Sequence, residues 1–571
     1  MEPNLLNSLR FSVSALALVL PACSSQVVPV TPVLAPYNVK ISNGTIYDGS
    51  GGPGYVGDVA INRDKIVCVG HCPGPAIRTI DATGLAVAPG FINMLSWATE
   101  SLIADGRGQS DIRQGVTLEV MGEGESLGPW NATMKANETA RQGDIKYSID
   151  WTTLGEYLHY LEKKGISPNV ASFVGATTVR VHELGEGDVD PTPEQLQRMR
   201  ALVRQAMNEG AMGVGSSLIY APANFAETPE LIALASEAGR CGGMYISHIR
   251  DEGPKLIEAI DELIEISEKS GAPGEIYHFK QSGRDNWHKI GAAIARVEAA
   301  RARGLRITAD MYTYPASSTG FDAAMPLWIQ AGGIEEWVRR LKDPAQRAKA
   351  MAEMRSPEAS ENTKLAVQEP DKVILVGFKT DVLKPLTGKT LGEVARERGK
   401  APEEVIADLI IADGTRIQVV YFGMSEENVA RHVTLPWMAF DSDAAAMAPE
   451  GVFLKSSTHP RAYGNFARLL GKYVREEKRV PLAEAVRRLT SFPASNLGIK
   501  DRGSLKAGNF ADIAVFDPEK ISDRATFTKP QQYAVGMVHV LINGVPVLRD
   551  GEHTGATPGR FVKGPGAGRC R

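Results

Sequence analysis

The chain has 571 residues, of which 43% are hydrophobic and 23% are charged. This composition is ordinary for folded proteins and excludes disorder of the chain as a whole, and the length suffices for one large domain or two. The 63 basic and 67 acidic residues are interspersed and leave a net charge of −4. No surface for nucleic acid is therefore predicted, and a small-molecule partner is favoured.

An apolar segment near the start of the chain predicts export. The apolar run over residues 11–22 follows Arg10 and ends at Cys23. This run is too short to span a bilayer but is typical of a secretory signal, and residues 20–23 are similar to a lipoprotein cleavage box. We expect residues 1–36 to be a leader and linker, and the protein to be periplasmic or attached to the membrane through a lipid on Cys23. The alternative is a cytoplasmic protein.

Short apolar runs separated by turn residues predict a small β domain built from both ends of the chain. Residues 37–88 contain such runs at 58–62 and 65–70, and residues 496–571 contain similar runs, for example at 512–516. We expect the two terminal segments to pair and to flank the centre.

Five cysteines are too few for a disulfide framework. Cys68 and Cys72 lie on either side of His71, so a local disulfide and a zinc site both stay open for this segment. Cys241 precedes a predicted buried strand and is expected to be an ordinary core residue.

Residues 89–495 alternate between predicted strands and helices. A capping box with proline at the first helical position, Thr192 to Gln195, begins one helix, and Gly210 ends it. The predicted strands cover residues 87–94, 116–121, 170–175, 211–216, 243–248, 275–278, 305–310 and 437–441.

Eight such units predict an α/β fold, a TIM-type (β/α)8 barrel, with a helical insertion at about 326–373. A doubly wound open sheet is the alternative, but no G-x-G-x-x-G motif follows the first strand.

We expect the catalytic residues at the strand ends, because active sites of barrels lie at the carboxyl ends of the strands. His248 and His278 end two predicted strands, and Asp443 follows the last one. Two imidazoles and a carboxylate that converge from separate strands suit zinc or a similar divalent ion. A divalent ion activates water and polarises a carbonyl, and Asp443 is expected to carry the proton from that water to the leaving nitrogen. Lys280, two residues after His278, points to the same face of the strand.

The chain resembles the D-aminoacylase (N-acyl-D-amino-acid deacylase) family of the amidohydrolase superfamily from about residue 39 to residue 566. The matching motifs are Val87-Ala88-Pro89-Gly90-Phe91-Ile92, Gln114-Gly115-Val116-Thr117, Leu218-Ile219-Tyr220, Ser247-His248-Ile249-Arg250-Asp251-Glu252-Gly253, His278-Phe279-Lys280, the run from Asp310 to Thr319, Ser442-Asp443, His459-Pro460-Arg461-Ala462-Tyr463-Gly464, and the run from Gly508 to Asp512.

The resemblance implies a metal-dependent hydrolase of a linear amide C–N bond that acts on an N-acyl amino acid or a related amide. It also implies that Lys280, Tyr312 and Ser318 hold the substrate's carboxylate and acyl parts, and that Tyr220 lines the pocket.

The sequence departs from the superfamily pattern at the metal site. Leu95-Ser96-Trp97 stands where an H-x-H motif would fall, and the family's metal-binding cysteine after the second strand is absent. The resemblance then leaves one divalent ion, zinc, held by His248, His278 and a carboxylate, with Glu123 preferred over Glu125. Two other functions stay open: a non-catalytic binding protein, and an enzyme acting on a cyclic amide or a small D-peptide.

Overall fold

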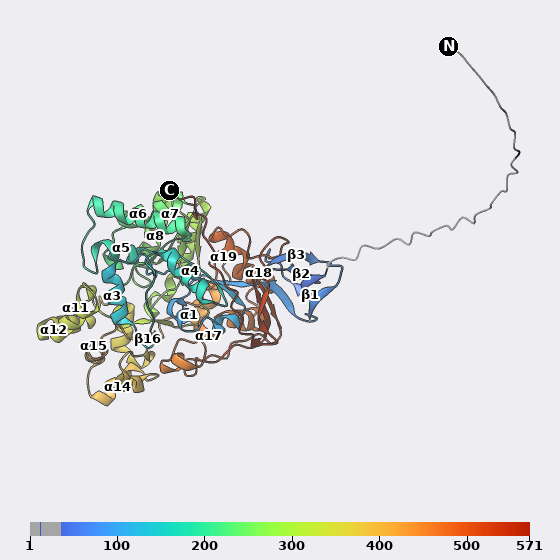
Figure 1. Cartoon of the computed structure of the whole chain (residues 1–571). Helices are drawn as coiled ribbons and strands as arrows, with labels where there is room; N and C mark the ends of the chain where they lie inside the picture. Colours follow the sequence, from blue (N-terminus) through green and yellow to red (C-terminus); the bar gives the residue numbers. More distant parts are fainter. Residues whose placement is uncertain (1–11, 13–35, 571) are drawn as a thin grey trace, which may run out of the picture.

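The computed structural model describes residue 12 and residues 36–570, which form a mixed α/β protein. The expected lipid attachment site, Cys23, lies outside the described residues. Within them, no helix is both long enough and apolar enough to span a membrane. In Figure 1 the strands β1, β2 and β3 (within residues 37–70) lie at one end of the molecule, beside the red C-terminal segment. The helices α11, α12, α14 and α15 (within residues 334–413) lie at the opposite end.

Both terminal segments contribute to one nine-stranded sheet. Its strands are β1 (Tyr37–Ile46), β2 (Tyr55–Asn62), β3 (Lys65–Gly70), β4 (Ala76–Asp81), β5 (Ala86–Pro89), β17 (Ile513–Phe516), β18 (Met537–Ile542), β19 (Val545–Arg549) and β20 (Glu552–His553). The order is β20-β19-β18-β17-β5-β1-β2-β3, and β4 pairs with β1. The two ends of the chain meet where β17 runs antiparallel to β5. Ile41 and Val59 from one segment and Ile513 and Leu541 from the other share a hydrophobic cluster.

Two sheets of parallel strands form the centre of the protein. Their strands are β6 (Phe91–Asn93), β7 (Val116–Met121), β8 (Asn169–Ser172), β9 (Val174–Gly175), β10 (Gly213–Ser217), β11 (Met244–His248), β12 (Gly274–Ile276) and β13 (Ile307–Ala309). The orders are β6-β7-β8 and β9-β10-β11-β12-β13. Since β8 and β9 belong to one stretch of chain, the two sheets adjoin there.

The expected strand over residues 437–441 is not a regular strand, but its backbone links the outer strands of the two sheets. Ala439 N donates to the O of Ala309, the last residue of β13 (2.7 Å), and Asp443 N donates to Leu95 O after β6 (3.0 Å). An isolated parallel bridge joins Met438 to Ala309.

The expected strand over residues 87–94 is divided between two sheets at Gly90. The part before Gly90 pairs with β17, and the part after it pairs with β7. A side chain at position 90 would collide with Thr117, because a Cβ there would lie 2.1 Å from its Oγ1. Only glycine therefore permits this crossing from one sheet to the other.

Helices follow the parallel strands in the expected alternation. They are α1 (Thr99–Ala104), α2 (Gln109–Ile112), α3 (Ala132–Arg141), α4 (Leu154–Lys164), α5 (Ala176–Leu184), α6 (Pro193–Glu209), α7 (Thr228–Arg240), α8 (Leu256–Ser270) and α9 (Ile290–Ala302). Helix α6 has the predicted capping box between Thr192 and Gln195, and it ends at Gly210.

A separate group of elements follows β13. Its helices are α10 (Leu327–Gln330), α11 (Ile334–Lys342), α12 (Pro344–Met354), α13 (Glu361–Gln368), α14 (Leu391–Arg398) and α15 (Pro402–Asp413), and its strands are β14 (Ser317–Gly320), β15 (Val373–Gly377) and β16 (Gln418–Tyr421). The strands form an antiparallel sheet, β14-β16-β15, and the group has its own hydrophobic cluster. Helices continue beyond residue 373, so the extra elements extend further than the helical patterning predicted.

The rest of the chain returns to the parallel strands and then to the terminal sheet. It contains α16 (Glu426–His432), α17 (Arg461–Arg468), α18 (Leu482–Leu489) and α19 (Ser491–Asn496). The final segment runs past the starts of β8 and β10, where Val562 N donates to Val170 O (2.9 Å) and Gly564 N donates to Gly210 O (2.8 Å).

Two disulfides join the four cysteines of the described residues. Cys68 pairs with Cys72, with the Cα atoms 5.8 Å apart, so these sulfurs offer no thiolates for the alternative zinc site. Cys241 pairs with Cys570 across a sequence separation of 329 residues. Cys241 is therefore not an ordinary core residue, and that prediction is wrong. Its partner lies far away in the sequence, so no local signal indicated the pairing.

Candidate metal centre

One cavity of about 610 Å³ lies at the carboxyl ends of the parallel strands. The site residues predicted from the sequence all line it; they are Glu123, Tyr220, His248, His278, Lys280, Tyr312, Ser318 and Asp443. Trp97, Glu125, Glu252 and Arg461 line the same cavity.

Glu123 follows β7 and is 4% exposed. The backbone between β7 and Glu123 requires glycine at position 122. Its φ of +105° favours glycine, and a Cβ there would lie 2.3 Å from Phe173 O. The chain therefore turns sharply at the end of β7 and directs the Glu123 carboxylate toward β11 and β12.

His248 is the last residue of β11, and His278 lies two residues beyond β12. Nδ1 of His248 lies 2.9 Å and Nε2 of His278 lies 3.1 Å from Oε1 of Glu123. One ligand atom from each of these three residues lies within 4.8 Å of the other two, and all three side chains are buried. Two imidazoles and one carboxylate form a donor set that zinc commonly takes, with a fourth position left for water or substrate.

Glu252 lies on the side of both histidines that is opposite Glu123. Its Oε1 lies 3.2 Å from Nδ1 of His278, and its Oε2 lies 3.6 Å from Nε2 of His248. Lys280 Nζ donates to Glu252 (2.5 Å) and lies 2.8 Å from Nδ1 of His278. A carboxylate behind a histidine fixes the ring orientation and increases the basicity of the other nitrogen, as in metal sites.

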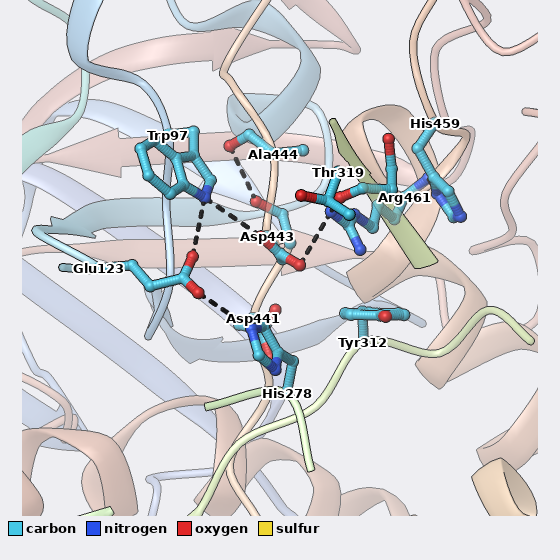
Figure 2. A network of polar contacts seen from close by, with 12 residues as sticks. Trp97, Glu123, His278, Tyr312, Thr319, Asp441, Asp443, Ala444, His459 and Arg461 are labelled. Carbon is cyan, nitrogen blue, oxygen red and sulfur yellow. Dashed lines mark hydrogen bonds and ion pairs between the residues drawn. The ribbon is translucent and has the colours of Figure 1, made fainter. Parts of the chain in front are cut away.

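Asp443 lies beside this group, and fixed donors contact both of its oxygens (Figure 2). The indole Nε1 of Trp97 donates to Oδ1 (3.2 Å), and Nη2 of Arg461 lies 2.8 Å from Oδ2. The same indole N–H also donates to Oε2 of Glu123 (3.1 Å). Trp97 therefore connects the two carboxylates, which lie on different segments of the chain.

Three further predicted residues form the wall of the cavity. Tyr220 packs edge-on against His248, with ring centroids 5.3 Å apart, and its hydroxyl hydrogen-bonds to Thr319 (2.7 Å). The ring of Tyr312 lies 4.4 Å from the guanidinium of Arg461. Ser318 accepts a hydrogen bond from Arg461 at its backbone oxygen (3.2 Å). Together, Tyr312 and Ser318 hold Arg461 in place.

The charged groups of the site shift one another's pKa values. Burial raises the pKa of Glu123, but hydrogen bonds with His248 and His278 outweigh this effect and hold the pKa below its ordinary value. Burial and Lys280 lower the pKa of His278, whereas Glu123 and Glu252 raise it, to about 9 as the net result. Burial raises the pKa of Asp443, although Arg461 opposes the shift.

Sequence reasoning missed the roles in this geometry of Glu252 and Arg461. Both lie inside motifs that carry the family resemblance, and Glu252 follows His248 by four residues, so the motifs were the available signal. Glu125, the second candidate ligand, lines the cavity but does not join the group formed by Glu123 and the histidines.

Comparison with known proteins places the chain in a family. D-aminoacylase from Alcaligenes xylosoxydans xylosoxydans is 32% identical over 536 residues, which cover 92% of this chain and 98% of that protein. The chain belongs to the D-aminoacylase family. The sequence profile described as "Amidohydrolase family" matches residues 438–548, a range that includes Asp443 and Arg461.

Solved structures of relatives show the same fold. A D-aminoacylase, whose binuclear metal centre is described as activated by one metal and attenuated by the second, superposes with a TM-score of 0.77 at 29% identity, over 92% of this chain and 100% of that one. An N-acyl-D-glutamate deacylase from Bordetella bronchiseptica, solved with zinc and a phosphonate mimic of the tetrahedral intermediate, gives 0.76 at 27% identity, over 93% and 100%.

Proposed function

We propose that this protein is a metal-dependent hydrolase of linear amide C–N bonds, an N-acyl-D-amino-acid deacylase. The observation that carries the proposal is the convergence of Glu123, His248 and His278 beside Asp443, in one cavity of a chain from the D-aminoacylase family. Relatives named D-aminoacylase and N-acyl-D-glutamate deacylase support the substrate class.

Glu123, His248 and His278 would hold one divalent ion, zinc. Zinc bound here would activate a water molecule and polarise the amide carbonyl. Leu95 has no lone pair to offer, and the indole of Trp97 is a donor only, so neither replaces a histidine ligand. A second ion would have few protein ligands, which distinguishes this chain from the relative with a binuclear centre.

Asp443 would carry the proton. A partly buried carboxylate with a raised pKa can accept a proton from the attacking water and then deliver it to the leaving nitrogen. Arg461 and Trp97 fix the orientation of Asp443, because each contacts one of its oxygens. The same group therefore acts first as base and then as acid.

Arg461 would bind the substrate's carboxylate. It is 2% exposed, and its Nε and Nη1 are buried without a hydrogen-bond partner among the described residues. These two groups are charged donors that would donate to the oxygens of a substrate carboxylate. Tyr312, Ser318 and Lys280 would complete this end of the pocket, and Tyr220 would line the side next to His248.

For the architecture, we propose that the two parallel sheets and residues 437–443 form one TIM-type (β/α)8 barrel, because that segment bonds to both outer strands. Residues 37–88 and 496–571 would form the small β domain. The barrel would span residues 89–495 and include the inserted helices, which were predicted at about 326–373 and continue in the structure to the end of α15.

For localisation, we propose export, with a lipid on Cys23 as the only attachment to a membrane. Two disulfides support an oxidising compartment such as the periplasm. Protein isolated from a bacterial membrane fraction with the leader up to Ala22 intact, as seen by mass spectrometry, would contradict the lipid anchor.

The function is tested with purified protein, elemental analysis and a substrate panel. We expect one zinc per chain and release of acetate or longer acyl groups from N-acyl-D-amino acids, but not from their L-enantiomers. Ring opening of a hydantoin with no deacylation would show a cyclic-amide hydrolase instead. A protein that holds zinc and hydrolyses no amide would contradict the proposal.

A further inference from the structure

Trp97 does more in the site than line the wall of the cavity. Its single indole N–H lies between two carboxylates, 3.1 Å from Oε2 of Glu123 and 3.2 Å from Oδ1 of Asp443 (Figure 2). The side chain is 36% exposed, so it reaches this position from the open side of the cavity.

The backbone on both sides of Trp97 fixes this arrangement. Trp97 N donates to Ala444 O (3.0 Å), and Ser96 N donates to Val120 O (2.8 Å). The backbone at Ser96 and Trp97 is thus joined both to the end of β7, which precedes Glu123, and to the segment that carries Asp443. These backbone hydrogen bonds place the Cα of Trp97 between the two segments that carry the carboxylates.

Two carboxylates that face the same space repel each other unless a positive charge or a hydrogen-bond donor lies between them. A cation would bind both, as a metal ion does, whereas an indole donates to both and ligates nothing. The oxygens that Trp97 contacts are also distinct from Oε1 of Glu123, which faces the two histidines.

We propose that Trp97 is a positioning residue that takes the place of a second metal ion. This role rests on the proposed function, and in it the indole has two effects. The N–H aligns Asp443 with the carboxylate that holds the ion, and the ring fills the space in which a second cation would contact both carboxylates. The centre then works with one ion and does not respond to excess metal.

The test compares the parent with Trp97→Phe, which keeps an aromatic ring and removes the N–H. We expect Trp97→Phe to retain one zinc per chain while kcat falls roughly 10- to 100-fold, as for a lost hydrogen bond to a charged group, with KM unchanged. Trp287→Phe is the matched control: its indole donates to the backbone oxygen of Gly423 (3.0 Å), and its loss should leave kcat unchanged.

The second arm is Leu95→His/Trp97→His, which supplies two imidazoles in place of the indole. After dialysis against excess zinc, elemental analysis should give two ions per chain for this variant and one for the parent. Calorimetric titration of the metal-free proteins with zinc should give the same stoichiometries.

The outcomes separate this inference from the proposed function. A parent that binds one zinc and hydrolyses its substrate, but takes up a second zinc with Trp97 intact, would overturn the role of Trp97 alone. A Trp97→Phe variant with the parent's kcat would do the same. A parent without zinc and without hydrolysis would instead overturn the proposed function.

Discussion

The two sides of the candidate metal centre are built differently. At the ends of β11 and β12, His248 and His278 lie between two carboxylates, the buried Glu123 and the partly buried Glu252. After β6, the neutral indole of Trp97 donates to Glu123 and to Asp443. One side can hold a cation and the other side can only donate a hydrogen bond. A strand end without any metal-binding side chain can therefore still orient the carboxylates of the site.

The largest effect is expected where the cation-holding side is broken. His278→Ala should remove the zinc and all measurable hydrolysis together, because only Glu123 and His248 would remain as protein ligands. His288→Ala is the control, since that histidine is exposed and lies in the next turn of chain. Elemental analysis and a deacylation assay report both quantities, and a His278→Ala protein that keeps its metal would refute the ligand set.

Asp443→Asn should keep the fold and the zinc but reduce kcat about 10²- to 10⁴-fold, because an amide cannot carry the proton. Asp285→Asn, at an exposed position, should leave kcat unchanged. The measurement is steady-state kinetics with metal content determined on the same sample. Activity within threefold of the parent would show that another group carries the proton.

Arg461→Lys keeps the positive charge beside Asp443 but loses the planar fork. We expect kcat/KM for N-acyl amino acids to fall about 10- to 100-fold, mainly through KM, because a lysine ammonium cannot place donors where both Nε and Nη1 of the guanidinium lie. An N-acyl amine without that carboxylate serves as the control substrate and should be affected much less. Equal losses for both substrates would argue against carboxylate binding by Arg461.

Glu252→Gln tests the carboxylate that lies on the side of the histidines opposite Glu123. Removing the negative charge next to His278 should weaken zinc binding about tenfold, the lower end of the effect of losing a supporting carboxylate. Competition with a chelator measures this affinity, and Glu258→Gln, at an exposed position on α8, is the control. Unchanged affinity would limit Glu252 to binding Lys280.

Local sequence signals predicted much of the fold. The capping box at Thr192 placed the start of α6, and the polar ends of the β11 and β12 segments placed His248 and His278 together. These features depend on hydrogen bonds and periodicities that span only a few residues, so a single sequence contains them.

Other features depend on partners far away in the sequence. In the antiparallel sheet of β14, β15 and β16, β14 pairs with β16, which lies about a hundred residues later in the chain. No sequence motif predicts this pairing. The division of one expected strand at Gly90 depends on Thr117. The donation from Trp97 to two carboxylates likewise required the structure, because the sequence showed only that Trp97 cannot bind metal.

The disulfide between Cys241 and Cys570 closes the chain between them into a covalent ring. The ring contains His248, His278 and Asp443, so a protease that cuts one surface loop within it leaves the fragments linked and the site in one molecule. The ring can close only after all of these residues have been synthesised, and oxidation therefore follows synthesis of this segment. On a denaturing gel, a nicked sample should run as a single band until a reducing agent separates the pieces.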